Sequence, residues 1–182
     1  MMRFNIILFL LFFPQIIVAN SSTSDQVDKA IQIVREKFQA AAKLGDENSS
    51  TNNYHQLQYT LASLLEFKAK NDDAAAVDEI ASLYHKAAAG LRGEKKIESL
   101  LKGASWYQQA GDGRAAAECS RTAVHFLIQE EGAAFDPGVI NAVLQSATPI
   151  LLKHEQPSSL QNLAASLVSC FPFLPAAHQL QG

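Results

Sequence analysis

Apolar side chains recur every three or four residues along almost the whole chain after Ser24, and this spacing constrains the fold more than any other feature. Val27, Ile31, Val34 and Phe38, for example, share one face of a helix, because an α-helix completes a turn in about 3.6 residues. A half-buried strand would instead place apolar residues at every second position. The sequence therefore predicts an all-α fold.

Glycine, proline and polar clusters divide this pattern into about seven helices. Gly111-Asp112-Gly113 is expected to end the fourth helix, and Asp136-Pro137 to begin the sixth with a capping aspartate and a first-turn proline. Pro149 is expected to kink or break the sixth helix, because its ring removes a donor and collides with the preceding turn. Short connections between the helices favour antiparallel neighbours. The expected helices are a first from about Ser24 to Gly45, a second from Tyr54 to Lys70, a third from Val77 that frays at Gly90–Gly93, a fourth around Ile97–Tyr107, a fifth around Ala116–Leu127, a sixth from Asp136, and a seventh from Gln156 to Cys170.

Composition and charge agree with a single packed domain. Of the 182 residues, 48% are hydrophobic and 18% are charged, which leaves enough apolar surface for a core. The formal net charge is −3 and both signs are mixed along the helices. Because no basic stripe is present, we do not expect nucleic-acid binding.

The first residues have the organisation of a secretory signal. Arg3 precedes the apolar run Ile6 to Phe13, and Ile17-Val18-Ala19 offers a cleavage site before a polar stretch. A retained membrane anchor is the alternative, but the run is shorter than the roughly 20 residues of a spanning helix. We therefore predict a cleavable signal peptide at 1–19, a polar linker at 20–24 and one helical domain at 25–182, with a Pro/Phe-rich tail from about residue 171. A secreted or periplasmic location follows from this, with no stable transmembrane anchor.

One helical hairpin carries a recognisable pattern. Ala104, a small residue at the expected helix crossing, is followed by Tyr107, by the turn at Gly111-Asp112, and by Ala116 and Ala123 on the returning helix. The segment Leu100–Val124 reads LLKGASWYQQAGDGRAAAECSRTAV and resembles a tetratricopeptide repeat. The segment Leu61–Ala88 resembles it more weakly.

The resemblance implies stacked helical hairpins that form a superhelix and accept a peptide or helix of a partner protein. A closed helical bundle is the alternative architecture. The side chains with which some family members hold a peptide's terminal carboxylate have no clear match, so no ligand residue is carried over. An aromatic residue can serve as an anchor for a partner, and Trp106, Tyr84 and Tyr107 are the candidates. For Trp106, packing against the adjacent hairpin is the favoured interpretation, because tryptophan is generally buried.

Two cysteines, Cys119 and Cys170, fall on the predicted apolar stripes of their helices. In an oxidising compartment they could form a disulfide that closes a loop of about 50 residues and contributes about 4 kcal/mol. Two separate buried thiols are the alternative. Sequence leaves the choice open, because the distance between the two Cα atoms decides it.

No constellation of catalytic or metal-binding residues is recognisable. The five histidines do not form the i, i+4 pair of a zinc helix; they are His55, His85, His125, His154 and His178. Acids at Asp72, Asp73, Asp78 and Glu79 are explained by their place at a helix N-terminus. We therefore expect no catalytic site, cofactor or metal. The sequence favours an exported, non-catalytic module that binds or scaffolds a protein or peptide partner in a groove between helical hairpins. A helical bundle that binds a small apolar ligand or lipid is the alternative, and an enzyme with an unfamiliar site is a third possibility.

Overall fold

The computed structural model describes residues 23–43, 51–71, 76–129 and 135–172, and these form seven α-helices without a strand. The all-α prediction is confirmed. In chain order the helices are α2 (Thr23–Lys43), α3 (Thr51–Asn71), α4 (Val77–Ala88), α5 (Gly93–Gln109), α6 (Gly113–Gln129), α7 (Pro137–His154) and α8 (Pro157–Cys170).

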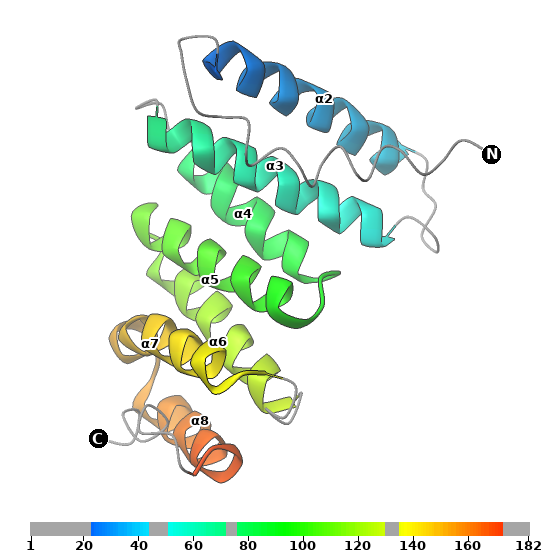
Figure 1. Cartoon of the computed structure of the whole chain (residues 1–182). Helices are drawn as coiled ribbons and strands as arrows, with labels where there is room; N and C mark the ends of the chain where they lie inside the picture. The colour runs from blue at the N-terminus through cyan, green and yellow to red at the C-terminus, as the bar shows by residue number, and fades with distance from the viewer. Residues whose placement is uncertain (1–22, 44–50, 72–75, 130–134, 173–182) are drawn as a thin grey trace, which may run out of the picture.

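The helices are stacked in the order in which they follow along the chain, from α2 at one end to α8 at the other (Figure 1). From α2 to α7 each helix packs on the next, α5 also contacts α7, and α6 contacts α8. Extensive contacts therefore join helices that are neighbours or next-but-one neighbours. This arrangement is the predicted stack of hairpins, and not the closed bundle that was its alternative.

Two large apolar clusters follow one another along the stack. The first joins α2, α3 and α4 and includes Trp106 from α5. The second extends from the end of α4 to α8 and Phe171. A small cluster between α5, α6 and α7 contains Ala104, Ala116 and Cys119. Small side chains there allow the helices to approach closely, as the alanine pattern of the sequence predicts.

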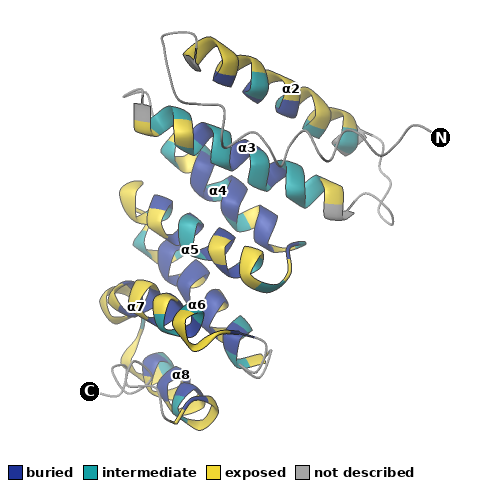
Figure 2. Ribbon diagram, viewed as in Figure 1, coloured by how far each residue is buried: buried dark blue, intermediate teal, exposed yellow. Residues whose placement is uncertain are grey.

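The two end helices each expose one side (Figure 2), and most of the residues exposed there are polar. Stacks of helical hairpins need such ends, because the outer face of the last helix meets water and no further hairpin. On α2 the exposed residues are mostly charged or amide-bearing, with Ile33, 52% exposed, as an apolar exception: Gln26, Asp28, Lys29, Gln32, Glu36 and Lys37. On α8 they are mostly small or uncharged polar residues: Ser158, Gln161, Asn162, Ala165, Ser166 and Ser169.

Local signals account for the turns. Asp136 caps α7, and its Oδ1 accepts a hydrogen bond from the Gly138 amide at 2.7 Å, as predicted. Gly111 has a φ of +82° after α5 and Gly93 a φ of +56° at the start of α5. L-residues with side chains rarely adopt these values, so glycine is the residue that suits both turns.

Pro149 was predicted to kink or break the sixth helix; the break is wrong, and the kink stays a prediction. α7 runs from Pro137 to His154 with Pro149 inside it. Pro149 and Gln145, whose carbonyl loses its amide donor, are both exposed, so water can hydrogen-bond that carbonyl. α7 therefore tolerates the proline on its solvent side.

Several predictions fall outside the described residues and stay predictions: the signal peptide at 1–19, most of the linker at 20–24, the helix end at Gly45 and the tail from residue 173. None of the helices in the described ranges has the length and apolar character needed to cross a bilayer.

Candidate functional site

A stripe of polar residues on α3 faces polar residues of α5. Tyr59, Ser63, Glu66 and Lys70 are spaced four, three and four residues apart, which places them on one face of α3. Glu98 and Lys102 form an i, i+4 pair on α5, with Nζ–Oε1 at 3.1 Å. Together with Tyr84 of α4, these residues are called the inter-hairpin cluster, because they join the α3–α4 hairpin to the α5–α6 hairpin.

Glu66 lies at the centre of the inter-hairpin cluster, with its side chain 13% exposed. Its carboxylate accepts hydrogen bonds from the Tyr84 hydroxyl and from Lys70 Nζ at 2.6 Å. Lys102 Nζ lies 3.6 Å from the second oxygen. Burial alone would raise the pKa of Glu66, but the hydrogen bonds from Lys70 and Tyr84 and the charge of Lys102 lower it overall. Glu66 is therefore held as a carboxylate that connects three helices.

Lys102 occupies the boundary between this buried centre and the solvent. Its ammonium lies between Glu66 and Glu98, and 5.8 Å and 5.4 Å from the ring centroids of Tyr59 and Tyr84. Burial and a hydrogen bond to Glu98 raise the pKa of Tyr59, which therefore stays neutral. The side chains of Lys102 and Glu98 are nevertheless 34% and 47% exposed. The inter-hairpin cluster thus presents two cations, Lys70 and Lys102, and one anion, Glu98, to any molecule that approaches.

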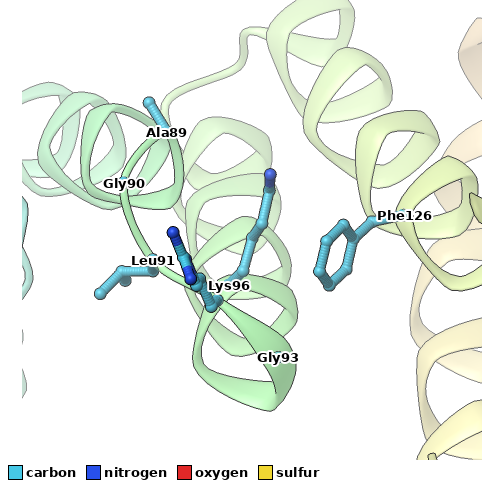
Figure 3. Close-up of a pocket in the computed structure, with 7 residues that line it drawn as sticks. Ala89, Gly90, Leu91, Gly93, Lys96 and Phe126 are labelled. Carbon is cyan, nitrogen blue, oxygen red and sulfur yellow. The ribbon is translucent and has the colours of Figure 1, made fainter. Parts of the chain in front are cut away.

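A pocket of about 530 Å³ opens at the turn between α4 and α5 (Figure 3). Five consecutive residues of the turn, Ala89 to Gly93, form one wall, and Lys96 and Phe126 complete it. The Lys96 ammonium lies 4.7 Å from the centroid of the Phe126 ring. Side chains from two hairpins therefore meet around this turn.

Two of the three predicted partner-facing aromatic residues are buried, and for them that prediction is wrong. Tyr84 is 0% exposed, because it packs under α3 and bonds to Glu66. Trp106 is 6% exposed and belongs to the first apolar cluster, so packing against the adjacent hairpin is its observed role. Tyr107 is half-buried and makes an edge contact with His85, with centroids 6.1 Å apart.

The disulfide considered between Cys119 and Cys170 is not formed in the structure, where both are free thiols. Cys119 is buried between α5, α6 and α7, whereas Cys170 ends α8 and is exposed. The expectation that Cys170 lies on the apolar stripe is therefore wrong. Burial raises the pKa of the Cys119 thiol to about 12, which keeps it protonated and unreactive.

The described histidines have structural surroundings. His55 Nδ1 lies 3.0 Å from Gln58 Oε1 and 3.1 Å from the Lys86 carbonyl oxygen, which ties α3 to the end of α4. In the described parts of the chain, no group of three or more His, Cys, Asp or Glu side chains is arranged to hold a metal ion. His178, Asp72 and Asp73 lie outside those parts.

Comparison with protein-family models, with curated proteins and with solved structures found no match for this chain. The resemblance of Leu100–Val124 to a tetratricopeptide repeat therefore stays a prediction. What the structure does show of this segment is a hairpin of α5 and α6 with Ala104 and Ala116 in one apolar cluster.

Proposed function

We propose that this protein is a non-catalytic module that binds a partner protein at the inter-hairpin cluster. The observation that carries the proposal is the Lys102–Glu98 pair, which is exposed although its position is fixed by contacts with Glu66 and Tyr59. Long charged side chains normally lose conformational freedom when they bind. The contacts within the inter-hairpin cluster already restrict the Lys102 and Glu98 side chains in the folded protein. Binding a partner therefore costs less conformational entropy at these two residues.

The chemistry of the inter-hairpin cluster fits a polar segment of a protein that carries both charges. Glu66, Glu98, Lys70 and Lys102 are two acids and two bases, so the cluster attracts neither strong acids nor strong bases as a class. A segment with a base and an acid at matching spacing would pair with Glu98 and Lys102. Ser105 continues their stripe one turn further along α5 and is exposed.

Site-specific photo-crosslinking tests this proposal. A photoreactive residue replaces Ser105 beside the inter-hairpin cluster, or Ser169 on the exposed side of α8 as the matched control. After irradiation in extract of the native source, we expect one protein to be captured from position 105 and not from position 169. Mass spectrometry of the crosslinked band identifies it.

A pair of variants then tests the role of Glu98 with the captured protein. Glu98→Gln should weaken its affinity by about tenfold, since an ion pair with the partner is lost. Glu94→Gln, one turn earlier on α5 and also exposed, should leave the affinity unchanged. Equal capture from positions 105 and 169, or equal affinities of the two variants, would show that binding does not use the inter-hairpin cluster.

A further inference from the structure

The charged residues that line the pocket at the α4–α5 turn are all positive. Two of its lining residues, Arg92 and Lys96, are cations, and no acid is among the residues that line it. Neither cation forms an ion pair with a carboxylate within the described parts of the chain, which is also true of Lys29, Lys37, Lys86, Lys95, Arg114 and Lys153. Two positive charges and no carboxylate therefore line one cavity, with Glu94 as the nearest acid in the sequence.

A ring contact orients Lys96, and the backbone of the turn positions Arg92, whose side chain is exposed. Lys96 is half-buried and its ammonium lies 4.7 Å above the Phe126 ring, a cation–π contact that orients it. Phe126 in turn packs edge-on against Phe135, with centroids 6.1 Å apart. Arg92 is in the turn itself, directly before Gly93, whose φ of +56° sets the course of the chain there. The pocket is thus lined from two hairpins with defined geometry.

We propose that this pocket binds a small molecule through an oxyanion group, a carboxylate or a phosphate. An arginine guanidinium offers donors in a planar fork that matches either group, and a lysine adds a compact charge. The volume of about 530 Å³ lies within the range of small-molecule sites. This site is separate from the inter-hairpin cluster and stands independently of the proposed protein partner.

Titration of the full chain with inorganic phosphate and, separately, with acetate tests the proposal. Amide NMR signals of Gly90 and Gly93 report on the pocket, because both residues line it. Both signals should shift and saturate with at least one of the two anions. Tighter binding of phosphate assigns the group as a phosphate, and tighter binding of acetate assigns it as a carboxylate.

A charge-matched pair of double variants separates a site from general attraction. Arg92→Gln with Lys96→Gln should raise the dissociation constant at least about tenfold. Lys95→Gln with Arg114→Gln removes the same charge from two exposed residues outside the pocket and should change it less than about twofold. Circular dichroism verifies that all variants are folded. Equal weakening in both double variants, or no saturable shift with either anion, overturns the proposal.

Discussion

Glu66 receives contacts from side chains of three successive helices: Lys70 on its own helix, Tyr84 on α4 and Lys102 on α5. A buried carboxylate is costly unless its hydrogen bonds are satisfied. Both hydrogen-bond donors belong to the α3–α4 hairpin, and docking of the α5–α6 hairpin adds the positive charge of Lys102 at 3.6 Å. The stability of the ionised Glu66 side chain therefore depends in part on how α5 packs against α3 and α4.

The lowered pKa of Glu66 predicts how stability depends on pH. A carboxyl group whose folded-state pKa is depressed stabilises the fold above its unfolded-state value of 4.5 and loses this contribution as pH falls through the folded-state value. Glu66→Gln should lower the free energy of unfolding by about 1–3 kcal/mol at pH 7, since charged hydrogen bonds are lost. Between about pH 7 and about pH 3 its stability should fall less than that of the natural protein. Urea denaturation at a series of pH values measures both effects, and parallel pH profiles would contradict this role of Glu66.

For individual residues, the sequence predicted buried positions better than exposed ones. Apolar spacing located Val27, Ile31 and Leu100 in the core, where the structure has them. It failed for Trp106, because α5 contacts α4, α6 and α7, and such a helix buries more than one face. The inter-hairpin cluster was missed, although the spacing of Tyr59, Ser63, Glu66 and Lys70 is a periodic signal. Only the docking of α5 onto α4 gives that stripe its partners.

In α7, core packing overrides the tendency of Pro149 to break the helix. Ile140, Val143, Leu144, Ala147 and Leu151 are buried on both sides of the proline, so breaking the helix would separate core residues. Pro149→Ala should restore the missing hydrogen bond and raise the free energy of unfolding by about 1–3 kcal/mol. Pro137→Ala is the matched control: it lies in the first turn, where no donor is needed, and should change stability by less than about 0.5 kcal/mol. Thermal and urea denaturation compare the two, and a Pro149→Ala protein no more stable than the control would show that the helix carries no strain there.

The sequence predicted a helix boundary correctly where one or two local residues determine the position of the helix end. Asp136-Pro137 and Gly111 act through capping and backbone conformation, which depend on the local sequence alone. α3 instead begins at Thr51, three residues before the predicted Tyr54, although the polar Thr51-Asn52-Asn53 looks like a loop. Asparagine and threonine are weak helix formers, and their helical state was not predictable from propensity.

At the scale of the whole molecule, stability should vary along the stack. α5 contacts α4, α6 and α7, whereas the extensive contacts of α2 are with α3 alone and those of α8 with α6 alone. Native-state hydrogen exchange should therefore be at least about tenfold faster in α2 and α8 than in α5. Mass spectrometry of peptides from each helix measures this, and uniform protection from α2 to α8 would indicate one cooperative unit.

The polar outer sides of α2 and α8 also limit how the molecule can grow. If the end helices of a hairpin stack expose apolar faces, the last helix of one copy can pack against the first helix of the next copy, and the copies then assemble into fibres. End-to-end packing of this protein would have to bury the charged side chains of Asp28, Lys29 and Lys37 on α2, and the desolvation of these charges costs free energy. The exposed polar side chains of α2 and α8 therefore disfavour end-to-end stacking of two copies through these helices.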